Sequence, residues 1–273
     1  ALPMPDGATY FGSALGQVLR RSPDGRWENL PIGRLDAVTA LAADGDSLVA
    51  GTESGAVLRG NPSTGEWQEL PFRVRGIVRD IHHFRTGEWF VVGEDLRAGQ
   101  LEVSVYSGPS LVGMSAPPSQ VFQQEWKRAL WDGTIPHVHL IGTPDTYLVH
   151  WRAKEPLAVY SASARQWGVA RTPKKLPVFT GSGDGLLMRT ADGSVVYASS
   201  PQIKSIDGGR TWTPYRIPGR LALSRLFDND NALALSLNMG MFSGSQEVQV
   251  SRDGGKKWRK LVDMPQAGCL DFS

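Results

Sequence analysis

Short apolar segments alternate with glycine-containing turns along most of the chain. Residues Asp36–Ala43 and Ser47–Thr52 flank the turn sequence Asp-Gly-Asp, which is typical of a β-hairpin. Ala56–Gly60 follows a second turn, and a strand that contains Trp67 follows a third. This pattern predicts four antiparallel strands within about 40 residues. No segment shows the 3.6-residue period of a long amphipathic helix.

Tryptophan marks the outer strand of each predicted unit. These residues recur at a mean spacing of about 46, the length of one four-stranded β-propeller blade, at Trp27, Trp67, Trp126, Trp167, Trp212 and Trp258. Four further units are predicted from the same pattern. They comprise Ile77–Phe84, Trp89–Glu94, Glu102–Tyr106 and the Trp126 strand; His137–Ile141, Tyr147–Trp151, Leu157–Tyr160 and the Trp167 strand; Val178–Gly181, Leu186–Arg189, Val195–Ser199 and the Trp212 strand; and Leu221–Phe227, Ala232–Leu237, Glu247–Ser251 and the Trp258 strand.

The two chain ends are predicted to complete one blade together. The N-terminal residues supply three strands, Thr9–Gly12, Gln17–Arg21 and the Trp27 strand, and the C-terminal residues supply one, Cys269–Phe272. Joining both ends in one sheet leaves no exposed edge along the channel. We therefore expect an all-β chain that forms a single six-bladed propeller domain over residues 1–273. The irregular stretch 95–135 leaves the blade count open.

Two turn sequences share the pattern Ser-x-Asp-Gly-Gly-x-x-Trp, and a shortened copy lies near the N-terminus. The residues of the pattern are Ser205, Asp207 and Trp212; Ser251, Asp253 and Trp258; and, in the shortened copy, Asp24 and Trp27. The pattern resembles the Asp-box, the BNR repeat of sialidase-like propellers. We expect a structural role, in which the carboxylate accepts N–H bonds in the turn and the glycines supply positive φ. The tryptophan would pack below the turn as an apolar anchor.

Composition narrows the function classes. Lysine and arginine total 29 against 27 aspartate and glutamate, and this net charge of +2 is not that of a nucleic-acid-binding protein. The single cysteine forms no intrachain disulfide, and no apolar run reaches the about 18 residues of a membrane span. Because the first residue is Ala1, we expect that a signal peptide or an expression tag was removed. A signal peptide would make the protein periplasmic or secreted, and we expect a monomer.

All five histidines fall between positions 82 and 150. His137 and His139 would share one face of a strand, near His82 or His83 if that strand is innermost. Neutral imidazoles that converge in this way bind Zn²⁺ or another transition metal. Because the spacing places no acidic partner beside them, packed or hydrogen-bonded histidines are the favoured interpretation, and no metal site is predicted.

Arginine recurs just before the inner strand of three predicted units, at Arg34, Arg75 and Arg220. In a propeller this connection lies on one face beside the channel mouth, so the three guanidinium groups would ring that mouth. Their forked donors suit a carboxylate or a phosphate. This channel-rim hypothesis predicts an anionic ligand, such as an acidic protein segment or an acidic sugar. Solvated surface charge is the alternative interpretation.

The Asp-box resemblance implies two function classes. The chain is similar in character to photosystem II assembly-factor-like bacterial propellers, which implies a non-enzymatic scaffold that binds a protein partner, as an exported assembly or accessory factor of a membrane-protein complex. Sialidases imply instead a glycan-binding or glycoside-hydrolysing enzyme. That family needs further arginines, a Tyr–Glu nucleophile pair and an acidic Asp, and the sequence places no such set. The scaffold is therefore favoured, with no catalytic residue and no cofactor predicted, while the identity of the partner stays open.

Overall fold

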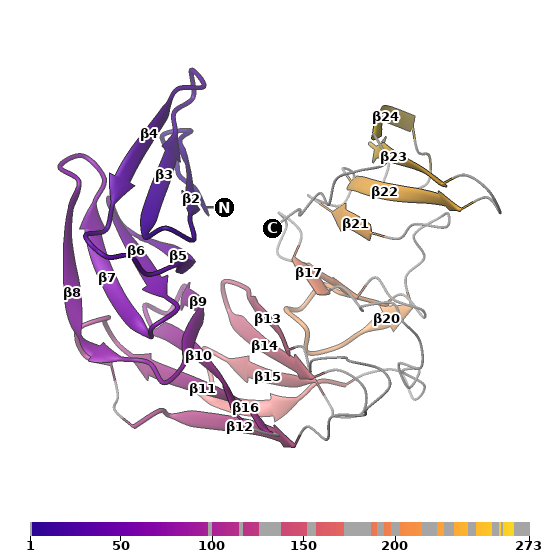
Figure 1. Cartoon of the computed structure of the whole chain (residues 1–273). Coiled ribbons are helices and arrows are strands. Elements are labelled where there is room, and N and C mark those ends of the chain that lie inside the picture. The colour runs from indigo at the N-terminus through magenta and orange to yellow at the C-terminus, as the bar shows by residue number, and fades with distance from the viewer. Residues whose placement is uncertain are drawn as a thin grey trace. The chain divides into compact units, whose positions relative to one another are not determined.

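The computed structural model describes residues 2–97, 100–114, 117–125, 138–151, 157–171, 187–189, 194–197, 203–214, 223–226, 232–239, 244–252, 257 and 259–264. All regular elements within these residues are β-strands (Figure 1), as the apolar pattern predicts. A helix long and apolar enough to cross a membrane is not found in this described part of the chain.

The chain divides into two compact units, the N-terminal unit Ala1–Pro136 and the C-terminal unit His137–Ser273. Three four-stranded sheets make up the described part of the N-terminal unit. The first contains β1 (Leu2–Pro3), β2 (Thr9–Gly12), β3 (Gln17–Arg21) and β4 (Trp27–Pro31). The second contains β5 (Val38–Asp44), β6 (Ser47–Thr52), β7 (Ala56–Asn61) and β8 (Glu66–Arg73). The third contains β9 (Ile77–His83), β10 (Trp89–Arg97), β11 (Gln100–Gly108) and β12 (Gln120–Glu125).

The described part of the C-terminal unit likewise forms three four-stranded sheets. Its strands are β13 (Val138–Gly142), β14 (Thr146–Trp151), β15 (Ala158–Ser161) and β16 (Gln166–Val169); β17 (Leu187–Arg189), β18 (Val195–Tyr197), β19 (Ile203–Ser205) and β20 (Thr213–Pro214); and β21 (Leu223–Leu226), β22 (Ala232–Met239), β23 (Gly244–Ser251) and β24 (Arg259–Met264). In every sheet the strands follow chain order and neighbouring strands are antiparallel. The prediction of four-stranded antiparallel sheets is thereby confirmed. That residues 1–273 form one domain stays a prediction.

The first sheet corrects the predicted pairing of the chain ends. Its innermost strand is β1, with Leu2 opposite Tyr10 on β2. A tight turn makes this hairpin: Gly7 has a φ of 81°, and the Ala8 N–H donates to Asp6 Oδ1 over 3.0 Å. The N-terminal residues therefore complete their own sheet, at the edge that the sequence pattern assigned to Cys269–Phe272. Those C-terminal residues lie outside the described part of the chain.

The fifth sheet in chain order, β17–β20, starts later than predicted. Leu187–Arg189 is its first strand rather than its second, and the predicted strand Val178–Gly181 lies outside the described residues. The third strand is Ile203–Ser205, which pairs with β18 on one side and β20 on the other. A strand this short leaves no alternating pattern to detect, because period-two alternation needs several residues to show.

Consecutive sheets of the N-terminal unit pack face to face. This packing explains why β6 has apolar side chains on both of its faces. Val49 belongs to the cluster shared with the third sheet, while Leu48 and Ala50 belong to the cluster shared with the first. All three side chains are fully buried. The sheet of β5–β8 therefore lies between the other two (Figure 1), and each of its faces is core.

The turn between β6 and β7 touches the connection from β8 to β9. The Val74 N–H donates to the Gly55 carbonyl over 2.9 Å. Gly55 has a φ of +83°, and a Cβ at this position would lie 2.1 Å from the Val74 carbonyl oxygen. Only glycine permits this approach, which fixes the path by which the chain enters the third sheet.

Replacing Gly55 by alanine should test this contact. Gly65 is the matched control, because its φ of +72° is similar but a Cβ there meets nothing within 4 Å. Gly55→Ala and Gly65→Ala both place an alanine at an unfavourable positive φ. Gly55→Ala also forces two backbone segments apart, so we expect it to lower the free energy of unfolding by roughly 1–3 kcal/mol more than Gly65→Ala. Urea unfolding of both variants measures the difference, and equal losses would show that the contact does not constrain the fold.

Candidate functional site

Two of the three predicted channel-rim arginines are described, and both are already ion-paired. Arg34 lies between β4 and β5, where its Nη1 donates to Glu69 Oε2 at 2.5 Å. Arg75 lies between β8 and β9, with its Nε 3.2 Å from Asp95 Oδ2 and its Nη1 3.3 Å from Glu102 Oε1. Any anion at this face would compete with these carboxylates. Arg220 lies outside the described residues, so the channel-rim hypothesis stays a prediction.

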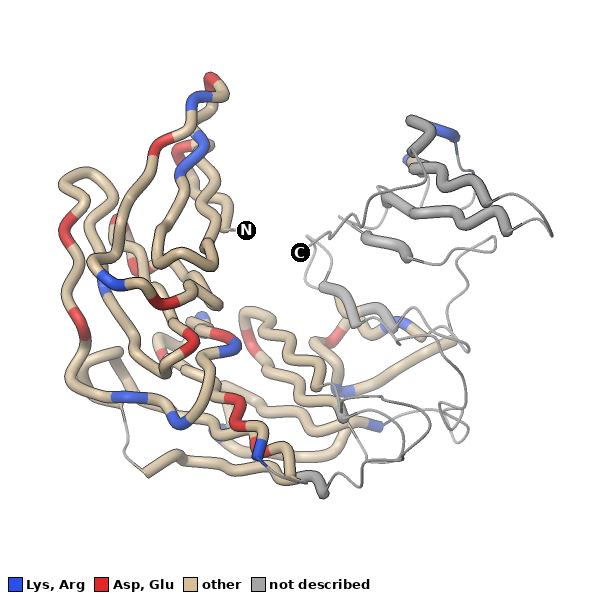
Figure 2. Tube along the Cα trace, viewed as in Figure 1, with Lys and Arg blue, Asp and Glu red and all other residues tan. Residues whose placement is uncertain are grey.

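In the N-terminal unit, arginines are interspersed with aspartates and glutamates along the strands and loops (Figure 2). Glu69 also accepts from Arg73 Nη2 at 2.8 Å, and Asp95 accepts from Arg97 Nε at 2.7 Å. Each carboxylate thus joins a loop arginine to a strand arginine. The sequence did not reveal these partners, because Glu69 is 35 positions from Arg34 and Glu102 is 27 positions from Arg75.

The turn at 205–212, called here the box turn, is held by its own aspartate. Asp207 Oδ1 accepts from the Ser205 hydroxyl at 2.7 Å and from the Thr211 N–H at 2.9 Å, and Oδ2 accepts from the Thr211 hydroxyl at 2.6 Å. Burial raises the pKa of Asp207, but these hydrogen bonds outweigh it and hold that pKa below its usual value. The carboxylate therefore stabilises the turn most when it is ionised.

The box turn is seated on the preceding sheet of the same unit. The Thr146 hydroxyl on β14 donates to the Gly208 carbonyl at 2.5 Å. Gly209 has a φ of +89°, and a Cβ there would lie 2.1 Å from Leu148 Cδ2. Trp212 is buried and donates through Nε1 to the Gly209 carbonyl at 2.9 Å. The turn, its glycines and its tryptophan thus join two sheets.

The shortened copy at 22–27 corrects the expectation that its tryptophan is an anchor. Asp24 does accept bonds within the turn, from the Ser22 hydroxyl and the Arg26 N–H. Trp27, however, is 58% exposed, with its ring 5.3 Å from that of Phe11. Because this copy has fewer residues between the aspartate and the tryptophan, Trp27 becomes the first residue of β4 and does not reach beneath the turn. In the third copy Ser251 ends β23, while Asp253 and Trp258 lie outside the described residues.

Replacing Asp207 by alanine should destabilise the protein by roughly 1–3 kcal/mol, because the Thr211 N–H and the Ser205 hydroxyl lose their acceptor. The matched control Asp24→Ala removes the corresponding aspartate from the exposed copy of this turn and should lower the free energy of unfolding by less. Unfolding midpoints in urea measure both. The Asp207→Ala loss should shrink as the pH falls below the ordinary carboxyl value of 3.8, since protonation weakens the same bonds in the parent. A loss no larger than that of Asp24→Ala would contradict this role.

Four of the five histidines are described, and none stands with two other metal-ligating side chains in the described residues. His82 meets Phe84 edge-on at 4.6 Å between ring centroids, and His83 stacks on Trp89 at 4.1 Å. His139 on β13 lies directly opposite His150 on β14, with 6.1 Å between the ring centroids. His137 lies outside the described residues. Packed rings are therefore the environment of His82 and His83.

His150 is buried and should make stability depend on pH. Burial, and secondarily the charge of His139, lower the pKa of His150 from 6.5 to about 4. As the pH falls below 6.5, His150 becomes protonated in the unfolded chain but stays neutral in the folded chain until about pH 4. We therefore expect a loss of about 3 kcal/mol of stability between about pH 7 and pH 4.

His150→Leu should flatten this dependence, because the variant has no group at that position to titrate. The measurement is the free energy of urea unfolding against pH for parent and variant. Equal slopes in the two proteins between the two pKa values would show that His150 is not responsible.

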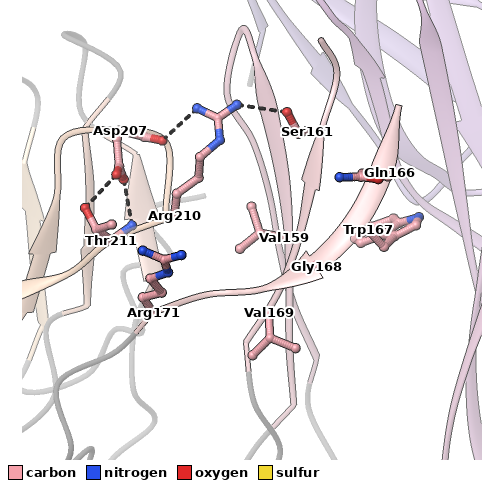
Figure 3. Close-up of a pocket in the computed structure, with 10 residues that line it drawn as sticks. All are labelled: Val159, Ser161, Gln166, Trp167, Gly168, Val169, Arg171, Asp207, Arg210 and Thr211. Atoms are coloured by element: carbon pink, nitrogen blue, oxygen red, sulfur yellow. Dashed lines mark hydrogen bonds between the residues drawn. The ribbon is translucent and has the colours of Figure 1, made fainter. Parts of the chain in front are cut away.

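A pocket of about 480 Å³ lies in the C-terminal unit, between the outer strand β16 and the box turn (Figure 3). Its lining residues are Val159, Ser161, Gln166, Trp167, Gly168, Val169, Arg171, Asp207, Arg210 and Thr211. The sequence pattern singled out Trp167 only as a repeat marker and gave Arg171 and Arg210 no role. Nothing in the sequence joins these residues, because the pocket forms only when two sheets meet.

Backbone and side-chain contacts fix the polar wall of this pocket. Arg210 Nη2 donates to the Ser161 hydroxyl at 3.1 Å and Nη1 to the Asp207 carbonyl at 3.3 Å. The Arg171 N–H donates to the Arg210 carbonyl at 2.8 Å. The wall therefore carries the guanidinium group of Arg210, held by these bonds, and that of Arg171, whose backbone is bonded to the box turn.

Comparison with known proteins identifies the fold. A structure of YCF48 bound to D1 peptide superposes with a TM-score of 0.55 at 13% identity, over 95% of this chain and 84% of that one. A structure of U3-55K superposes with a TM-score of 0.56 at 13% identity, over 98% and 81%. A streptogramin B lyase structure superposes with a TM-score of 0.53 at 6% identity, over 85% and 74%. The chain thus has the β-propeller fold that the repeat pattern predicted.

No protein-family model matches the chain, and no curated protein matches it in sequence. The Asp-box class and the blade count of six therefore stay predictions.

Proposed function

We propose that this chain is a non-enzymatic β-propeller scaffold that binds a protein partner through loops of the N-terminal unit. A pair of exposed leucines carries the proposal: Leu15, between β2 and β3, is 69% exposed, and Leu35, between β4 and β5, is 98% exposed. Large apolar side chains exposed on adjoining loops are typical of surfaces that a partner covers. A single exposed leucine would carry no such meaning.

The two leucines stand on loops whose backbones touch. The Ile32 N–H donates to the Gly16 carbonyl at 3.2 Å, and the Val38 N–H donates to the Ser13 carbonyl at 2.9 Å. Leu15 directly precedes Gly16, and a Cβ on Gly16 would lie 1.7 Å from the carbonyl oxygen of Arg34, the residue before Leu35. Because the loops are already fixed, little conformational freedom is lost when a partner covers the pair.

Charged residues border the leucine pair. Arg34 is next to Leu35 in the chain and is paired with Glu69, while Asp36 on the other side accepts from the Ser54 N–H at 3.1 Å. An apolar centre with a polar rim is the usual anatomy of a protein interface. The likeness in fold to YCF48 bound to D1 peptide supports a peptide or protein ligand.

We extend the proposal to an exported assembly or accessory factor of a membrane-protein complex, located in the periplasm or secreted. What supports this finer role is the resemblance of the box turn to the Asp-boxes of such propellers.

The double variant Leu15→Ser, Leu35→Ser tests the proposal. The parent is used to capture proteins from a native cell-envelope fraction, and a captured protein is identified by mass spectrometry and purified. We expect the double variant to bind it roughly tenfold to hundredfold more weakly, because two leucines are no longer buried. Calorimetry with both purified proteins measures the change.

Val112→Ser is the matched control, since Val112 is also exposed and lies on another loop of the same unit. It should bind like the parent. Undiminished binding by the double variant would refute the loop face as the docking surface. Hydrolysis of a glycoside by the parent would favour the sialidase-like alternative.

A further inference from the structure

We infer that the pocket between β16 and the box turn binds a carboxylate group of a peptide, an inference that rests on the proposed function only in taking the ligand to be a peptide. The pocket belongs to the C-terminal unit, whereas the leucine pair belongs to the N-terminal unit. Its volume of about 480 Å³ falls within the range of pockets that hold small ligands.

Gly168 is the first observation that points to a ligand. It lies inside β16, where a glycine weakens a strand. Its φ is not positive, and a Cβ there would meet only the Val159 carbonyl oxygen, at 4.0 Å. Neither the backbone nor the packing of the described residues requires a glycine, in contrast to Gly55 and Gly209. Gly168 lines the pocket without placing a side chain in it, and Figure 3 shows it on β16 between the arginines and Trp167.

Arg171 is the second observation. Its backbone is fixed by the hydrogen bond to the Arg210 carbonyl, and its guanidinium group lines the pocket. No carboxylate in the described part of the chain forms an ion pair with it, whereas Arg34 and Arg75 each have two carboxylates. The Arg171 guanidinium group therefore has donors available for a carboxylate brought by a ligand.

The charges of the pocket favour a ligand with a single negative charge. Two arginines, Arg171 and Arg210, stand against one aspartate, Asp207, which leaves one positive charge. Both oxygens of Asp207 already accept hydrogen bonds within the box turn. A carboxylate would balance the remaining charge, whereas a doubly charged phosphate would face the Asp207 carboxylate with excess negative charge.

The remaining lining residues suit the body of a peptide. Val159, Val169 and Trp167 offer apolar surface, and the Gln166 amide supplies a hydrogen-bonding group. Figure 3 shows the arginines on one side of Gly168 and Gln166 with Trp167 on the other. A carboxylate with an apolar neighbour would therefore meet complementary groups on both sides. The carboxylate comes either from the chain terminus of the peptide or from an Asp or Glu side chain.

Three short peptides separate these two sources. The probes are acetyl-Ala-Leu-Ala with a free terminal carboxylate, the same peptide as its terminal amide, and acetyl-Ala-Glu-Ala amide. Each is titrated into the full-length ¹⁵N-labelled chain, and the NMR shifts of the Gly168 amide and the Trp167 indole N–H are followed. We expect a carboxylate peptide, but not the uncharged amide, to move both signals at millimolar concentration. No movement with either carboxylate peptide would overturn the inference.

Two variants then locate the binding. Arg171→Gln should weaken it roughly tenfold or more, and the matched control Arg21→Gln, which removes an arginine on β3, should not. Gly168→Val should abolish binding by filling the pocket while leaving the unfolding midpoint unchanged or raised. Parent-like binding by Gly168→Val would overturn the inference. If the parent binds none of the carboxylate peptides while Leu15→Ser, Leu35→Ser still loses the envelope partner, the pocket inference falls and the proposed function stands. If Gly168→Val loses the carboxylate peptides but still captures that partner, both stand.

Discussion

The hydrogen bond from the Thr146 hydroxyl to the Gly208 carbonyl joins two sheets of the C-terminal unit, and the candidate pocket depends on it. Thr146 is itself buried and held by Thr143, whose hydroxyl lies 2.7 Å from its own. Seated in this way, the box turn presents Arg210 and Thr211 to β16. The Arg171 N–H can then reach the Arg210 carbonyl. A turn whose carboxylate acts only locally thus positions a wall of guanidinium groups, because buried polar groups must be satisfied and this seating satisfies them.

In the N-terminal unit, each of the first two sheets is joined to the next sheet by a related contact, which is made by backbone atoms alone. The turn that precedes the third strand of each of its first two sheets touches the connection into the next sheet, at Gly16 with Arg34 and at Gly55 with Val74. Each contact fixes a loop that would otherwise be free at the end of a sheet. As a result, Leu15 and Leu35 are exposed to solvent on loops whose backbones are fixed. Rigid loops on a scaffold of packed sheets are a common location for binding residues.

Local pattern was enough to predict most strands. Gln17–Arg21 and Ser47–Thr52 have the predicted bounds, since turns with glycine delimit them on both sides. The strands Leu2–Pro3 and Ile203–Ser205 were missed because two or three residues carry no periodicity. The ion pairs and the pocket lay beyond prediction for another reason. Arg210 and Ser161 are 49 positions apart, and their contact exists only because consecutive sheets pack against each other.

Three glycines differ in whether the fold requires them. Gly55 and Gly209 have positive φ, and a Cβ at either would lie 2.1 Å from its nearest neighbouring atom. Stability alone accounts for both. Gly168 has neither property, since its φ is not positive and a Cβ there would meet only the Val159 carbonyl oxygen, at 4.0 Å. The fold does not require a glycine at 168. Gly168 lines the pocket together with Arg171, which has no carboxylate partner in the described residues, and this agrees with a role in ligand binding rather than in stability.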